Sequence, residues 1–243
     1  MALDTTVTGP NANSYASITQ ADSHLAYKPG IDTWNSLSAN QKEGLLVQAT
    51  LQIDLVDNNR SKRYYRAMDY RDEQALMYPS YYMLEEFAFN ASSFTTNSVT
   101  TTNLANRQHY PDDFWNGGAL VVYEGAGRGK TYEIADFDAS TGTVTINGTF
   151  SPAVDNTSQI RVFEAMEDDI INACIEQAYF LALGKDRKIR EKIENGIQSR
   201  KINGVAETYG AGYGAVTSSG VVMSIEAMSY LNKHIKKVST LRT

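Results

Sequence analysis

The sequence is poor in the residues that build disulfides, redox centres and metal sites. Among 243 residues there are one cysteine, Cys174, and three histidines. A single cysteine excludes an internal disulfide and a zinc site built from cysteines. Cys174 lies in the apolar run IINACIEQAYFLAL, which predicts a small buried residue rather than a nucleophile. No histidine is paired with a second metal ligand on an obvious helix face, so we expect no metal, no cofactor and no catalytic residue.

A membrane span, a secretory signal and an overall basic charge are lacking as well. No window reaches the roughly 18 apolar residues that a membrane helix needs. The N-terminus, MALDTTVTGPNANSYAS, has no basic segment followed by an apolar one. The formal net charge of −6 argues against non-specific binding along duplex DNA. We therefore expect no membrane partner and a protein that stays in the compartment where it is made.

One stretch, YEGAGRGKTYEI at residues 123–134, looks like a phosphate-binding loop. Such a loop has the pattern G-x-x-x-x-G-K-S/T between a buried strand and a helix. With Gly129 and Lys130 as its last glycine and lysine, the first glycine would fall at Glu124. The alternation from Thr131 to Ile134 favours a strand rather than a helix. We predict a glycine-rich turn between two strands.

The first ninety or so residues have the pattern of helices. Two capping boxes, Ser17 to Gln20 and Ser38 to Gln41, mark helix starts. The first helix should end near Tyr27. The second carries an apolar stripe at helical spacing, namely Leu45, Leu46, Ala49, Ile53 and Val56.

From about residue 91 the composition changes to Ser, Thr, Asn and Gly with short β-prone runs. Strands are expected at 119–123, 130–137, 142–146 and 159–163. Helix returns from Met166 to Leu183, where acidic residues suit the helix N-terminus. A glycine-rich extended arm follows. A final helix capped at Ser224 has its apolar stripe at Ile225, Met228, Leu231, Ile235 and Val238.

Paired acids in the β-rich block are the only candidates for acid-base chemistry, as in a hydrolase or glycan-binding module. Asp112 and Asp113 fit a turn better, and no nucleophile stands beside a base. The run from Asp136 to Gly142 is similar to a calcium loop, but it lacks the required Gly and Glu at the sixth and twelfth places. A hairpin connection is the better interpretation of that run.

Several segments keep a common order along the chain. They are Asn13 to Ser17, Ala21-Asp22, Trp34, Gln48 to Thr50, Ile53-Asp54, Gln74 to Leu76, Tyr78-Pro79, then Asp169, Ala173, Ala178, and Lys201 to Val205 before Tyr209. Together they resemble the head-to-tail adaptor, or head-completion, proteins of tailed bacteriophages. Ser80 stands where that family usually has arginine. The block from about Phe87 to Glu164 is outside the minimal family and resembles small β modules of phage structural proteins.

The resemblance implies an α+β fold, with a helical adaptor domain interrupted by a small β-rich insertion domain and followed by an extended C-terminal arm and terminal helix. The expected domains are residues 1–90 and 166–200 for the adaptor, 91–165 for the insertion, and 201–243 for the arm and helix. The expected portal-binding residues lie in this last part, namely Lys201, Ile202, Val205, Tyr209, Tyr213, Ile225, Met228, Leu231 and Ile235.

The function implied is structural rather than enzymatic. Such adaptors form a ring, usually twelvefold, that docks beneath the portal protein once DNA is packaged and presents a platform to tail or stopper proteins. Packaged DNA passes through the channel of the ring. The expected location is the virion neck, at the head-tail interface, after assembly in the host cytoplasm.

An alternative role comes from members of this family that are labelled DnaT-like, which implies a single-stranded-DNA-binding replication accessory protein. Such binding uses aromatic platforms in a basic groove. The residues available are Tyr64, Tyr65, Tyr70, Tyr78, Tyr81 and Tyr82, with Arg60, Lys62, Arg63, Arg66 and Arg71. These tyrosines are equally typical of cores and protein interfaces, and we favour that interpretation.

Overall fold

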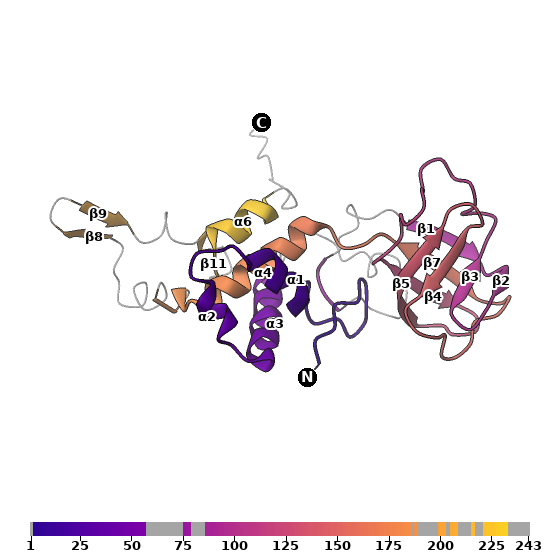
Figure 1. The fold of residues 1–243 in the computed structure, drawn as a ribbon, viewed down its shortest axis with the longest axis horizontal. Coiled ribbons are helices and arrows are strands. Elements are labelled where there is room, and N and C mark those ends of the chain that lie inside the picture. The colour runs from indigo at the N-terminus through magenta and orange to yellow at the C-terminus, as the bar shows by residue number, and fades with distance from the viewer. Residues whose placement is uncertain are drawn as a thin grey trace, which may run out of the picture. The chain divides into compact units, whose positions relative to one another are not determined.

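The computed structural model describes residues 2–56, 75–78, 86–185, 187–188, 199–202, 205–208, 215–216 and 221–232. Its contacts divide the chain into two compact units. Within the described residues, the helix unit consists of 2–3, 13–56 and those from 168 onward, and the sheet unit consists of 4–12, 75–78 and 86–167. Figure 1 labels the elements of both units.

The largest element of structure is a curled antiparallel sheet of seven strands (Figure 1). Its strands are β1 (Glu86–Asn90), β2 (Ser93–Phe94), β3 (Ser98–Thr100), β4 (Ala119–Glu124), β5 (Lys130–Asp138), β6 (Thr143–Ile146) and β7 (Gln159–Phe163). They lie in the order β1-β7-β4-β5-β6-β3-β2. The expected fold class is therefore wrong. The protein is mostly this curled half-barrel with few helices, and not a helical adaptor domain with a small β insertion.

The missed strands explain the error. β1 falls inside the part of the sequence that has a helical pattern, and it is held by pairing with β7, where Phe89 lies opposite Ile160. β2 and β3 are short and polar, and β3 is fixed by β6, with Val99 opposite Val144. Strand formation depends on such cross-strand neighbours more than on local propensity. The local sequence therefore reveals the four central strands and hides the outer ones.

The sheet curls at β5, the strand shared by its two halves. β5 pairs with β4 from Lys130 to Glu133 and with β6 from Ile134 to Asp138. The register against β6 shifts between Ile134 and Asp136. An irregularity of this kind bends a strand and increases its twist. The bend lets side chains from both halves of the sheet meet in one core.

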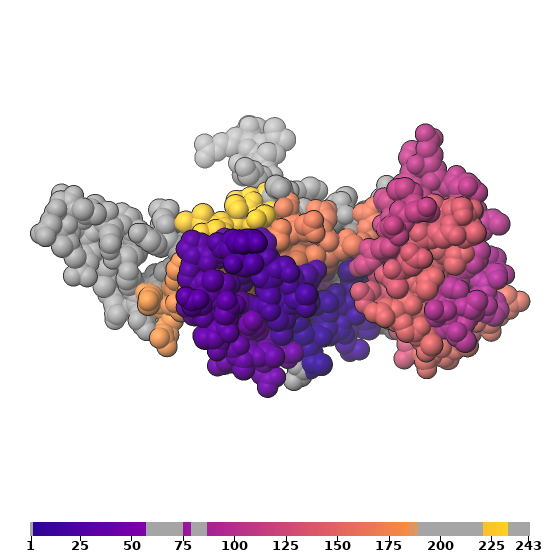
Figure 2. All heavy atoms as spheres, viewed as in Figure 1, coloured from indigo at the N-terminus to yellow at the C-terminus, as the bar shows by residue number. Residues whose placement is uncertain are grey.

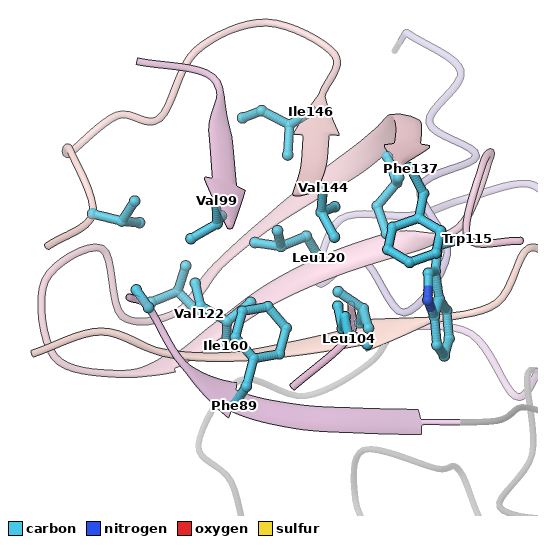
Figure 3. Packing of buried hydrophobic residues seen from close by; sticks show 14 of the residues in the cluster. Phe89, Val99, Leu104, Trp115, Leu120, Val122, Phe137, Val144, Ile146 and Ile160 are labelled. Carbon is cyan, nitrogen blue, oxygen red and sulfur yellow. The ribbon is translucent and has the colours of Figure 1, made fainter. Parts of the chain in front are cut away.

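That core lies on the inner side of the curl (Figure 3). Leu120 and Val122 of β4 point into it together with Ile160 and Val162 of β7. Trp115 is fully buried there. The remaining buried members are Phe89, Ala91, Val99, Leu104, Ile134, Phe137, Val144, Ile146, Phe150 and Val154. Alternate residues of β4 and β7 form a second small cluster, namely Ala119, Val121 and Phe163 with Val7.

The helix unit is built around one central helix. Its helices are α1 (Ile18–Leu25), α2 (Ile31–Asn35), α3 (Ala39–Val56), α4 (Asp168–Ala182) and α6 (Ile225–Leu231). α4 packs against the other four. Both predicted capping boxes are confirmed, because the backbone N–H groups of Ser17 and Ser38 donate hydrogen bonds to the side-chain oxygens of Gln20 and Gln41. Residues 13–56 contribute the indigo surface of this unit in Figure 2.

The region expected to be an extended arm contains two short hairpins. β8 (Ser199–Ile202) pairs with β9 (Val205–Thr208), and β10 (Ala215–Val216) pairs with β11 (Val222–Met223). Both pairs are antiparallel. Among the described residues, no helix combines the length and the hydropathy that crossing a membrane requires.

Two glycines of the β4–β5 turn provide a test of the sheet unit. Gly125 and Gly127 both have left-handed φ angles, of 77° and 82°. A Cβ on Gly125 would lie 2.0 Å from the Thr157 carbonyl oxygen, whereas one on Gly127 would meet only ordinary contacts from 3.4 Å. We expect Gly125→Ala to lower the free energy of unfolding by about 3 kcal/mol and Gly127→Ala by about 1 kcal/mol. Urea denaturation measures both, and equal losses would contradict the clash.

Candidate assembly interface

The residues that carry the family resemblance near the N-terminus contact one another in the helix unit. The Tyr15 hydroxyl donates a hydrogen bond to Asp54. The Tyr15 backbone N–H donates to Thr50 Oγ1 at 3.2 Å. Thr50 also lies 3.3 Å from the Cys174 sulfur, which connects α3 to α4. These side chains therefore serve the framework of the unit.

Cys174 is confirmed as a small buried residue. Its side chain has no exposed surface, and burial raises the pKa of its thiol to about 11. At neutral pH the thiol therefore stays protonated. Since the thiolate is the reactive form of cysteine, Cys174 contributes packing rather than chemistry.

Asp22, Trp34 and Lys42 form a compact polar contact between α1, α2 and α3. Trp34 Nε1 donates to Asp22 Oδ1 at 2.7 Å, and Lys42 Nζ donates to the same oxygen at 2.8 Å. The Lys42 ammonium also lies 5.3 Å from the centre of the Trp34 ring. Partial burial acts to raise the pKa of Asp22, but the bonds from Lys42 and Trp34 outweigh it and hold that pKa below the ordinary 3.8.

Gln177 was not singled out by any pattern in the sequence, and it connects three distant segments. Its Nε2 donates to Gln52 Oε1 at 2.6 Å and to the Val222 carbonyl at 3.1 Å. Its Oε1 accepts from the Ser224 N–H at 2.8 Å. The amide is fully buried, so each of these bonds satisfies a group that water cannot reach. The Gln177 side chain on α4 therefore holds α3 and the segment that begins α6 in fixed positions against α4.

Glu176 is a second buried polar residue of α4, 4% exposed as a side chain. Its Oε1 accepts from His24 Nε2 at 2.8 Å and from Lys28 Nζ at 2.7 Å. Burial acts to lower the pKa of Lys28, and the hydrogen bond to Glu176 more than offsets it, so the pKa lies above its ordinary value. The Lys28 ammonium and the hydrogen bond with His24 compensate the cost of burying this side chain.

A solvent-open hollow of about 470 Å³ lies between α1 and α4 beside this cluster. Its lining residues are Thr19, Gln20, Ser23, His24, Asp168, Ile171, Asn172 and Ile175. His24 is already bonded to Glu176, and the lining pairs no nucleophile with a base. The hollow provides a polar surface rather than a site for chemistry.

The outer side of α3 carries a row of four exposed positions, two of them leucines, which we call the α3 stripe. It consists of Gly44, Gln48, Leu51 and Leu55, all exposed and spaced by four, three and four residues. Leu51 is 52% exposed and Leu55 is 43% exposed. A Cβ on Gly44 would meet no atom within 4 Å. This spacing places the four positions along one side of the helix.

The inner side of α3 is apolar as well. Leu46, Ala49 and Ile53 are fully buried, and α3 packs on α4. A helix that is apolar on opposite sides is typical of a helix covered on both. The helical spacing of the sequence predicts the larger inner stripe but not the outer one, whose signal is two leucines, Leu51 and Leu55, four residues apart.

The near-P-loop stretch is confirmed as the turn between β4 and β5. Its backbone N–H groups are used within the protein. Those of Arg128 and Lys130 donate to the Gly125 and Gly127 carbonyls, and that of Gly129 donates to Val122. No helix follows the turn, which leads directly into β5. It therefore lacks the set of converging N–H groups that holds a phosphate.

The candidate acids of the sheet unit stabilise turns. Asp112 accepts a hydrogen bond from the Ala139 N–H at 2.7 Å. Asp138 accepts from the hydroxyl groups and N–H groups of Ser140 and Thr141, which lowers its pKa. The predicted hairpin connection between β5 and β6 is thereby confirmed. Among the described residues, no three potential metal-ligating side chains come together.

The predicted portal-binding residues are distributed over several elements. Lys201 and Ile202 lie in β8, and Val205 lies in β9. In α6, Ile225 is 55% exposed, Met228 is half-buried and Leu231 is 1% exposed. Tyr209, Tyr213 and Ile235 lie outside the described residues, as does the basic tyrosine-rich segment 60–71.

No protein-family model, no curated protein and no solved structure matches this chain.

The Gln177 contacts generate a stability prediction. We expect Gln177→Leu to lower the free energy of unfolding by about 3 kcal/mol, because it removes the partner of the buried Gln52 side chain and of the Ser224 N–H. Asn172→Leu, on the same helix and half-buried in the lining of the hollow, should change it by less than about 1 kcal/mol. Urea denaturation followed by far-UV circular dichroism compares them, and equal effects would show that the buried amide is dispensable.

The pKa of Asp22 generates a pH prediction. Because this pKa is depressed in the folded state, its contribution to stability is complete above pH 3.8 and is lost as the pH falls through the lower folded value. At neutral pH, Asp22→Asn should lower the free energy of unfolding by up to about 1 kcal/mol, since the carboxylate is partly exposed. The difference from the parent should shrink in acid. Trp34 fluorescence, measured in a Trp115→Phe background, reports on this unit, and a pH-independent difference would contradict the assignment.

Proposed function

We propose that this protein is a structural virion component, a head-to-tail adaptor. Copies of the chain form a ring, of twelve in the family it resembles, between the portal and the tail or other neck proteins. The ring completes the DNA-filled head, and packaged DNA passes through its channel. The order of the resembling segments along the sequence motivates this assignment.

The α3 stripe is the observation that carries the proposal. Leu51 and Leu55 leave a large part of their apolar surface in water although they lie on a well-formed helix. Apolar patches of this kind are favoured where another protein surface covers them. A second copy of the chain is the occupant we assign, because a ring subunit has to bury surface against its neighbours.

A ring contact joins two different faces of the same subunit, so a second apolar surface is required. Tyr27, which follows α1, is 98% exposed. It belongs to the helix unit, as does α3. This side chain is the candidate to meet the α3 stripe of the next copy.

The use of the resembling residues is consistent with a structural role. Tyr15 donates hydrogen bonds to both Thr50 and Asp54, and these bonds hold the N-terminal segment against α3. Trp34 likewise donates a hydrogen bond to Asp22. This use of the resembling residues supports a structural role, because a subunit of an assembly has to keep its shape.

The portal contact is assigned to the C-terminal part, with Ile225 and Met228 as its described apolar members. This part cannot be tested by simple truncation. Val222, Met223 and Leu231 are buried, and the Gln177 amide bonds to residues 222 and 224. Removing it would damage the helix unit itself, so point substitutions at exposed positions are the appropriate test.

A charge placed on the α3 stripe tests the function. We expect Leu51→Glu to abolish a ring seen by light scattering of the purified chain, because burying an unpaired carboxylate in an apolar contact is costly. The same variant should fail to complete DNA-filled, portal-bearing heads, as judged by co-sedimentation and tail attachment. Far-UV circular dichroism should remain that of the parent, since Leu51 is exposed.

Asn40→Glu is the matched control, because it adds the same charge at an exposed position in the first turn of α3, outside the stripe. It should assemble like the parent. If Leu51→Glu assembles and completes heads as well as Asn40→Glu, the α3 stripe is not the contact. If the parent chain remains a monomer that ignores heads, the adaptor function itself is refuted.

A further inference from the structure

The chain contains four Asn-Gly dipeptides, at 116–117, 147–148, 195–196 and 203–204. In such a pair the backbone nitrogen of the glycine can attack the side-chain carbonyl carbon of the asparagine, since glycine has no side chain to hinder the approach. Asparagine is for this reason among the chemically labile residues of proteins. The first two pairs lie in described parts of the sheet unit, in contrasting surroundings.

Asn116 and Gly117 are held by the fold. Asn116 Nδ2 donates to Asp113 Oδ1 at 2.8 Å, and its Oδ1 is buried from solvent. The Gly117 N–H donates to the Ile134 carbonyl at 2.9 Å. The nitrogen that would attack is therefore engaged, and the side chain that would be attacked is fixed.

Asn147 and Gly148 lie just after β6, and both are exposed. Asn147 Nδ2 makes one long contact, 3.3 Å to Glu133 Oε2. Gly148 has a φ of 105°, and a Cβ placed on it would meet no atom within 4 Å. Its N–H makes no hydrogen bond to the described residues. The attacking nitrogen is free, and the surroundings leave room for the backbone to move.

From this contrast we infer that Asn147 is a site of spontaneous modification in the folded protein. The Gly148 nitrogen forms a bond to Cγ of Asn147 and gives up its proton, the Cγ–Nδ2 bond breaks, and the departing NH₂ group takes up a proton and leaves as ammonia. The resulting succinimide ring is opened by water to give aspartate or isoaspartate at position 147. No oxidant, reductant or enzyme is needed.

The product changes this corner of the sheet. The Asn147 N–H donates to the Glu133 carbonyl at 2.9 Å and continues the β5–β6 ladder by one bond. After the reaction a carboxylate replaces the amide beside Glu133, and like charges opposite each other destabilise a strand pair. Isoaspartate also adds a backbone carbon at this bond. On either side of this pair, the N–H groups of Ile146 and Phe150 donate to the carbonyls of Asn97 and Thr96, at 2.8 Å each.

The experiment follows both asparagines in one sample. The full chain is incubated in mildly alkaline buffer, and peptide mapping by mass spectrometry measures the replacement of NH₂ by OH at each site over time. We expect position 147 to convert at least several-fold faster than position 116 in the folded protein. Both should convert at similar rates in concentrated urea, where the contacts of Asn116 are lost.

Conversion at 147 no faster than at 116 in the folded chain would overturn the inference. So would a preference of the same size in urea, since it would then come from the local sequence and not from the fold. Asn147→Ser provides the control, because it should remove the fast product and leave the slow one at 116. The reaction at 147 does not depend on the proposed assembly role.

Discussion

The buried amide of Gln177 is the contact on which the helix unit depends. It joins Gln52 in α3 to residues 222 and 224 at the start of α6, so parts of the chain more than a hundred residues apart are held by one side chain. Because a buried amide has no water to bind, separating these segments would leave its polar groups unsatisfied. Together with the packing of the inner side of α3 on α4, this contact decides which side of α3 faces outward and carries the α3 stripe.

The stability of the sheet unit depends on a different constraint, the covering of one side of its short strands. Short strands gain stability when one side of their sheet is covered, and here the curl of the sheet encloses a shared core. The irregularity in β5 provides the bend, and large residues such as Trp115 and Phe137 fill the interior. The glycine turn between β4 and β5 and the side chains of Asp112 and Asp138 stabilise the connections between strands through hydrogen bonds.

Much of the local structure was predictable because its causes are local. The capping boxes of α1 and α3 need only four residues each, and the alternation of β4 and β5 reflects burial on one side of a strand. β1, β2 and β3 were not predictable, since their sequences become strands only beside β7 and β6. In α3, the buried inner stripe was predicted from its helical period. The candidate interface on the outer side was not, because the exposure of Leu51 and Leu55 depends on where α4 lies.

The sequence by itself determined the inert character of Cys174, the helix starts at Ser17 and Ser38, and the turn at residues 125–129, because each rests on the chemistry of adjacent residues. Only the tertiary structure decided that the sheet dominates the fold, that Gln177 and Glu176 are buried with partners, and that one Asn-Gly pair is held while another is free. Those outcomes depend on which distant groups come together, and the local pattern of a chain does not contain that information.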